Sequence, residues 1–186
     1  VLGGFIFIAI ALVVRDYPPE FAQQHKDEQK TINQMGYWRS LRYAFFSLQN
    51  WLGGIYTSLM NLMLVILGGL WGVLYLTTSF SLTMAQATDV TMMLFLGTVI
   101  GSPLVGYWSD RICLRRQPMM VGALLSFIFV MTLLYSTDLS FYALIFLFLG
   151  LGISTSAQII GYPTVAENSI PAITAMSVSV VNITTQ

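Results

Sequence analysis

The sequence is poor in charged and reactive side chains. Only 9% of its 186 residues are Asp, Glu, Lys or Arg, whereas an average soluble domain has roughly 25%. A single cysteine, Cys113, excludes an internal disulfide, and a single histidine, His25, leaves a His-based metal site without a second ligand of its kind. No Gly-x-x-x-x-Gly-Lys-(Ser/Thr) segment indicates nucleotide binding. We therefore expect no cofactor, no metal and no nucleic-acid partner.

The few cations are strongly segregated along the chain. All eight Lys and Arg residues lie in two stretches, 15–42 and 111–116, and residues 43–110 contain none. A cation at the centre of a membrane helix costs about 2.5 to 3.5 kcal/mol, so cations collect in loops, and the positive-inside bias places these loops on the cytoplasmic face. Both basic stretches should therefore face the same compartment, joined by an even number of membrane crossings.

Long uncharged runs supply these crossings. A membrane helix needs about 20 residues, and the runs that approach or exceed this length are 51–79, 90–109, 119–136 and 141–163. Two shorter apolar runs, 1–14 and 172–186, are expected to be partial spans, the first being the end of a truncated span. With 56% hydrophobic residues and a mean hydropathy of +0.74, the chain is predicted to be an all-α, polytopic membrane bundle that forms part of a larger protein.

The segment 15–50 is the only polar region of any size, and we expect it to be a cytoplasmic loop. Within it, Trp38, Leu41, Phe45 and Leu48 recur at helical spacing, while Arg39 and Arg42 point elsewhere. This pattern is typical of a helix that lies in the membrane interface. A helix packed beneath the membrane bundle is the alternative interpretation.

A short motif follows the second run. It consists of Gly106, Asp110, Arg111, Arg115 and Arg116, with Cys113 and Leu114 between the arginines. The motif resembles the Gly-x-x-x-Asp-(Arg/Lys)-x-Gly-Arg-(Arg/Lys) signature of the major facilitator superfamily, although Cys113 and Leu114 depart from it. From the residues alone, Gly106 would allow two helices to approach closely, and Asp110 could pair with Arg111 or Arg115. The alternative is that these are ordinary charges of a cytoplasmic loop.

The resemblance implies a fold and a mechanism. In the family this loop stabilises the outward-facing state, so the motif would be a conformational latch. Loop 15–50 would be the central connector, the four long runs would be the seventh to tenth spans, and an amino-terminal half would be the missing partner. The resemblance also implies an integral protein of the bacterial cytoplasmic (inner) membrane.

Polar side chains within the runs are candidates for a substrate cavity. Thr57, Asn61 and Tyr75 share one helix face, with Tyr56 and Trp71 beside it, and Ser154, Gln158 and Tyr162 recur every four residues in the fourth run. The resemblance implies that these two spans line the central cavity. The same residues could instead bond helices together, and Gly68-x-x-x-Gly72 or Gly97-x-x-x-Gly101 could serve close packing.

We therefore predict secondary active transport of a small organic solute across the bilayer by alternating access. None of the four runs contains an ionisable Asp, Glu, His, Lys or Arg, so these runs do not define an ion coupling, and Asp110 and Glu167 at their edges are weak candidates. A membrane enzyme and a channel subunit are the alternatives. The enzyme would need a nucleophile with a base, and the channel would need a filter-like loop.

Overall fold

The computed structural model describes residues 30–31, 33–136 and 138–185. The expected partial span 1–14 and the first part of loop 15–50 lie outside the described residues. Every regular element in the described part of the chain is helical. The elements are α3 (Tyr37–Phe46), α4 (Leu48–Met63), a π-helical segment (Leu64–Leu70), α5 (Gly72–Ser79), α6 (Met84–Ile112), α7 (Arg116–Tyr135), α8 (Phe141–Thr155), a 3-10 segment (Ser156–Ile160), α9 (Gly161–Glu167), a 3-10 turn (Pro171–Ile173) and α10 (Thr174–Thr185).

Four helices are long and apolar enough to cross a membrane. Within the described residues they are Leu48–Leu70, Met84–Ile112, Arg116–Tyr135 and Phe141–Glu167. A shorter apolar helix, Pro171–Thr185, follows them. The chain thus has the architecture of a multi-pass membrane protein.

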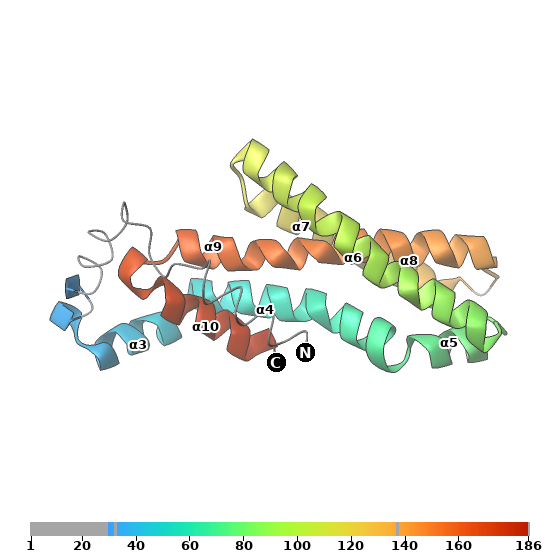
Figure 1. Ribbon diagram of the computed structural model, residues 1–186, viewed down its shortest axis with the longest axis horizontal. Helices are drawn as coiled ribbons and strands as arrows, with labels where there is room; N and C mark the ends of the chain where they lie inside the picture. Colours follow the sequence, from blue (N-terminus) through green and yellow to red (C-terminus); the bar gives the residue numbers. More distant parts are fainter. Residues whose placement is uncertain (1–29, 32, 137, 186) are drawn as a thin grey trace, which may run out of the picture.

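Helices α4, α8 and α9 run along the long axis, and α6 crosses α8 at an angle (Figure 1). The span that contains α8 and α9 runs beside α4. Helix α10 packs against α4, and α6 packs against α8. Small residues set the α6–α8 distance, because a Cβ on Gly152 would lie 2.1 Å from the Leu94 carbonyl oxygen and one on Gly97 would lie 2.3 Å from that of Leu149. Gly97 and Gly101 therefore serve close helix packing.

The two ends of the bundle differ in their content of positively charged residues. The α6–α7 turn, with Arg115 and Arg116, lies near the start of α4, because these arginines line a common cavity with Gln49. At the opposite end the turn at Phe80 and the turn at Asp138 line one small hollow. All Lys and Arg residues of the described ranges 33–136 and 138–185 are therefore at the end where α4 begins and α9 ends, as the charge pattern predicted.

The helix boundaries differ from the expected runs in ways that local chemistry explains. Helix α6 begins at Met84 rather than at Val90, because Thr83 and Gln86 form a reciprocal capping box. Asp89 is therefore an exposed residue of the helix rather than of a loop. The fourth run continues to Glu167, and the turn between the first two runs is shorter than expected.

The first run is not one continuous helix. After the π-helical segment, the Trp71 amide donates to the Ile66 carbonyl at 2.7 Å, and α5 starts in a new direction at Gly72. A Cβ at Gly72 would lie only 1.7 Å from the Leu67 carbonyl oxygen. The missing side chain of Gly72 thus permits the break.

Helix α3 turns its apolar face away from the bundle. Trp38 is 79% exposed and Phe45 is 42% exposed, whereas Ser40 and Ala44 are buried on the side that contacts α10. Leu48 belongs to α4, because α3 ends at Phe46. An exposed apolar face is compatible with the expected helix in the membrane interface, which stays a prediction.

The close contact between α6 and α8 gives a stability prediction. Gly152→Ala should lower the free energy of unfolding by about 1 to 3 kcal/mol, because the added methyl group meets the backbone of α6. Gly106→Ala is the matched control, since a Cβ there has no atom within 4 Å. Thermal unfolding of the purified full-length protein in detergent measures both, and equal midpoints would contradict the packing.

Candidate functional site

A polar cavity lies between α4, α6, the 3-10 segment and α10. Its volume is about 350 Å³, and it is called the polar cavity below. It is lined by Thr57, Asn61, Ser102, Ser156, Gln158, Ile159, Tyr162, Asn182 and Thr185. Apart from Ile159, these described lining residues carry hydroxyl or amide side chains, and none is Asp, Glu, Lys or Arg. The cavity therefore offers hydrogen-bond donors and acceptors without a formal charge.

Helices α4 and α9, on two sides of the polar cavity, approach each other closely. A Cβ on Gly161 would lie 2.1 Å from the Thr57 hydroxyl, so only a glycine allows α4 and α9 to meet at this level. The Thr57 hydroxyl donates to the Gly53 carbonyl at 2.9 Å and lies 3.5 Å from the Gln158 carbonyl oxygen. Thr57 therefore connects α4 with the 3-10 segment of the fourth span.

The backbone of the fourth span is irregular where it meets the cavity. Residues Ser156–Ile160 form a 3-10 helix inside an otherwise α-helical span. Pro163 lies four residues after Ile159, lacks an amide hydrogen and crowds the Ile159 carbonyl, which favours a departure from α-helical geometry there. The tighter turn places Ser156, Gln158 and Ile159 together on the cavity side.

Four of the residues predicted from sequence line this cavity, namely Thr57, Asn61, Gln158 and Tyr162. Four others do not. The Tyr56 hydroxyl donates to the Met119 carbonyl at 3.1 Å, on a different side of α4, and the Tyr75 hydroxyl donates to the Leu133 carbonyl at 3.1 Å, in the core at the opposite end.

Trp71 and Ser154 also lie elsewhere. Trp71 is 59% exposed at the break before α5, and buried Ser154 donates to the Gly150 carbonyl of its own helix at 2.8 Å. The predicted face assumed an unbroken α-helical period, but the π-helical segment has a wider turn and rotates everything beyond it. That rotation removes Tyr75 from the face shared by Thr57 and Asn61, and Trp71 from its expected place beside that face.

Four polar lining residues were not predicted: Ser102, Ser156, Asn182 and Thr185. Asn182 and Thr185 are three residues apart in α10, which is the spacing of neighbours on one helix face. Ser102 immediately precedes Pro103 inside α6. These polar positions in apolar segments were visible in the sequence, but only the fold shows that they face the same cavity.

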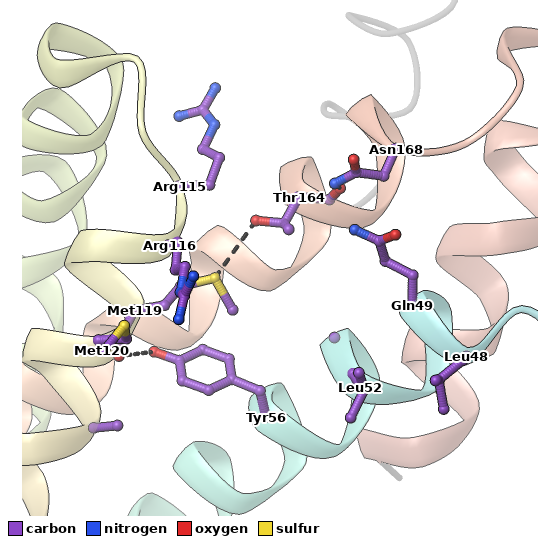
Figure 2. A pocket seen from close by; sticks show the side chains of 12 residues that line it. Leu48, Gln49, Leu52, Tyr56, Arg115, Arg116, Met119, Met120, Thr164 and Asn168 are labelled. Atoms are coloured by element: carbon purple, nitrogen blue, oxygen red, sulfur yellow. Dashed lines mark hydrogen bonds between the residues drawn. The ribbon is translucent and has the colours of Figure 1, made fainter.

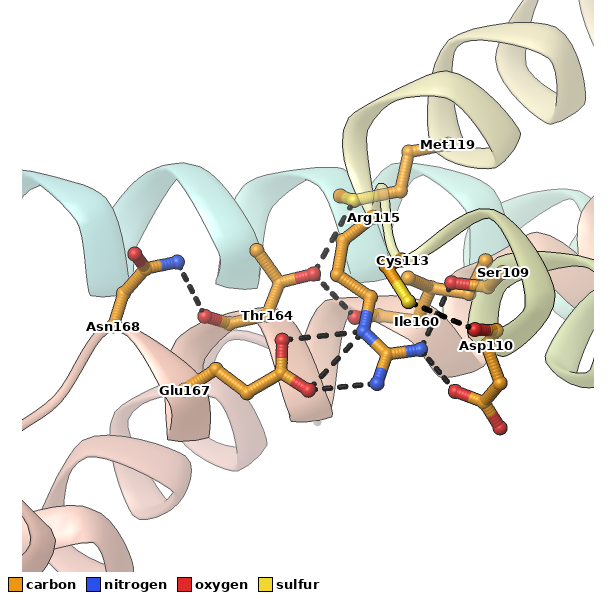
Figure 3. Close-up of polar contacts among 9 residues, drawn as sticks. All are labelled: Ser109, Asp110, Cys113, Arg115, Met119, Ile160, Thr164, Glu167 and Asn168. Atoms are coloured by element: carbon orange, nitrogen blue, oxygen red, sulfur yellow. Dashed lines mark hydrogen bonds and ion pairs between the residues drawn. The ribbon is translucent and has the colours of Figure 1, made fainter.

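An ion-pair cluster lies at the basic end, centred on Arg115 (Figure 3). The Arg115 guanidinium donates to Glu167 Oε1 at 2.6 Å from Nη2 and to Ser109 Oγ at 2.9 Å from Nη1, and it also pairs with Asp110. Hydrogen bonds to Glu167, and then to Asp110, raise the pKa of Arg115 further above its ordinary value. This Arg115 cluster connects the α6–α7 turn with the end of α9.

The other motif residues have different surroundings. Arg111 donates to the Tyr107 hydroxyl at 3.2 Å, and Arg116 faces a separate cavity at the same end. The expected close helix approach at Gly106 is not found, because open space surrounds the position where its Cβ would be. Arg115, which pairs with both Asp110 and Glu167, is thus the motif residue that links two helices.

Cys113 has a left-handed backbone, with φ of 55° and ψ of 24°, at the end of α6. Glycine normally occupies such a C-terminal position, because a side chain there is strained. This geometry gives a physical reason for the glycine that the resembled signature has at the same place.

The strained turn can be tested by substitution. Cys113→Gly should be tolerated, whereas Cys113→Val should be less stable than the glycine variant by about 1 to 2 kcal/mol, because a branched side chain resists positive φ. Thermal unfolding of the two purified variants compares them directly. A valine variant as stable as the glycine variant would show that the turn does not have this conformation.

Comparison with protein families, with curated proteins and with solved structures found no match to this chain. Among the described residues, no group of three or more His, Cys, Asp or Glu could hold a metal ion. The candidate site is therefore defined by its geometry: an uncharged polar cavity between membrane helices and, at one end of the same span, the Arg115 cluster.

Proposed function

We propose that the chain is part of a secondary transporter of the major facilitator type, which moves a small, uncharged polar organic solute by alternating access. The observation that carries this proposal is the polar cavity, whose hydrogen-bonding groups come from predominantly apolar helices. Binding sites of secondary transporters occupy this depth and are built on interrupted helices.

The lining chemistry supports the solute class. Amide and hydroxyl groups can replace the water around a polar solute, whereas a net charge on the solute would need an opposite charge in this low-dielectric region. The described lining offers Asn61, Gln158 and Asn182 as bifunctional amides and no counter-ion. An uncharged solute with several hydroxyl or amide groups fits this set.

The Arg115 cluster supports a coupled conformational change. Helix α9 follows directly from the 3-10 segment that lines the polar cavity and ends at Glu167, which pairs with Arg115. A movement of α9 relative to α6 would therefore break the Arg115–Glu167 pair while it reshapes the cavity wall. In this proposal the cluster stabilises one of the two states of the transporter.

The proposal includes the partners and the location. The bundle would act with an amino-terminal half of the same protein, in the bilayer of a bacterial cytoplasmic membrane. A membrane enzyme and a channel subunit stay as alternatives, but neither is favoured by a specific feature. The hydroxyls that line the polar cavity have no lining carboxylate or imidazole beside them to act as a base.

Alternating access can be tested before the solute is known. In the full-length protein with Cys113→Ser, a Gln158→Cys thiol should react with a membrane-impermeant maleimide in right-side-out vesicles and also in inside-out vesicles. The reason is that each state of a transporter opens the cavity to one side only. Reaction from one side alone would contradict alternating access, and passage of the reagent into the vesicle lumen would favour a channel.

The same assay tests the Arg115 cluster. Arg115→Gln should change the ratio of the two labelling rates several-fold, because it removes the contacts to Glu167 and Asp110. Arg111→Gln is the matched control, since Arg111 contacts only Tyr107 within its own helix in the described structure. Equal ratios in the two variants would remove the conformational role of the cluster.

A further inference from the structure

A second and larger cavity opens at the basic end, on another side of α4. Its volume is about 620 Å³, and it is called the basic-end cavity below. It is lined by Leu48, Gln49, Leu52, Gly53, Tyr56, Arg115, Arg116, Met119, Met120, Ala123, Thr164 and Asn168. It is distinct from the polar cavity proposed for the solute, with which it shares no lining residue.

The basic-end cavity has an apolar interior and a charged rim (Figure 2). Its apolar lining side chains include Leu52, Met120 and Ala123. Its inner boundary is fixed by the Tyr56 hydroxyl, which donates to the Met119 carbonyl at 3.1 Å, and by the Thr164 hydroxyl, which lies 3.6 Å from the Met119 sulfur. The cavity is therefore a built space between α4, α7 and α9 and not a loose gap.

The two arginines at the rim differ in what they contact. Arg115 is engaged by Glu167, Asp110 and Ser109, and its guanidinium points away from the lining side chains in Figure 2. Arg116 lies among the lining side chains, beside Met119 and Tyr56, and forms no hydrogen bond or ion pair with any described residue. Arg116 is thus an exposed cation without an internal counter-ion, at the mouth of an apolar space.

We propose that the basic-end cavity binds an anionic phospholipid from the cytoplasmic leaflet. The phosphate would pair with Arg116, and an acyl chain would lie against Leu52, Met120 and Ala123. Charge complementarity selects this occupant, because an apolar protein segment in the same place would leave Arg116 without a partner. Basic pockets between membrane helices at the cytoplasmic side are known to bind anionic headgroups.

The location of the cavity supports the same occupant. It begins where α4 begins, at Leu48 and Gln49, directly after helix α3. Helix α3 carries exposed Trp38 and Phe45 together with exposed Arg39 and Arg42, a composition suited to the headgroup level of a bilayer. The mouth of the cavity is therefore at the depth where lipid phosphates lie.

Native mass spectrometry of the purified full-length protein tests the proposal. The probes are dioleoyl phosphatidylglycerol and dioleoyl phosphatidylcholine, which have the same chains and differ in net charge. Arg116→Gln should weaken retention of the phosphatidylglycerol about fivefold, the effect of one cation near an anionic headgroup, and leave phosphatidylcholine unchanged. Arg111→Gln is the matched control and should change neither.

A second pair of variants tests the apolar part. Ala123→Phe and Leu52→Trp fill the cavity from two different helices, and each should reduce phosphatidylglycerol retention while the protein keeps its elution volume in gel filtration. Excess inorganic phosphate should not compete, because it lacks the acyl chain. Equal effects of Arg116→Gln and Arg111→Gln, full competition by phosphate, or unchanged retention in both filled variants would overturn the proposal.

Discussion

Exclusion of cations from hydrocarbon is the constraint on which the rest of the structure depends. The chain has eight Lys and Arg residues, and those in the described helices and turns lie at one end of the bundle. Because Arg111, Arg115 and Arg116 must stay near water, the α6–α7 turn is held at the end where α9 also terminates. The Arg115 cluster then forms between segments far apart in sequence, because Arg115 and Glu167 are brought to the same end of the bundle.

Departures from regular helix geometry connect this end of the bundle with its interior. The π-helical segment and Gly72 break the first span, and the 3-10 segment before Pro163 interrupts the fourth. A membrane helix with unmet backbone groups is stable only where protein or a hydrated cavity satisfies them. The polar cavity beside Gln158 meets this condition. Helix α9 connects the 3-10 segment at this cavity with Glu167 in the ion pair. The polar cavity and the ion pair are thus connected by one short stretch of chain, Ser156 to Glu167.

The sequence predicted the class of fold because two strong physical signals act over long windows. Uncharged runs locate the spans and clustered arginines orient them, so the four long helices and the common end of the described cations were expected. Helix ends were predicted less well, since the Thr83–Gln86 capping box extends α6 to Met84 by a local bond that hydropathy does not report.

The candidate site was only partly predictable. Thr57, Asn61, Gln158 and Tyr162 were predicted to share a cavity, and all four line the polar cavity. Trp71 and Tyr75 lie beyond the π-helical segment, where the assumed period fails. The pairing of Arg115 with Glu167 was also missed, since nothing in the sequence states that the end of the fourth span reaches the α6–α7 turn. Such contacts come from tertiary packing.

Membrane topology is the property that tests this account most directly. The sequence has one cysteine, Cys113, which is exposed at the basic end and supplies the first thiol to be tested in the full-length protein. A second variant, with Cys113→Ser and Ser140→Cys, places the thiol in the turn at the opposite end. In intact cells, an impermeant maleimide should modify the thiol at position 140 and should reach Cys113 only after the membrane is permeabilised. Modification of both thiols from the same side would contradict the threading, and the cavity and ion-pair assignments would fail with it.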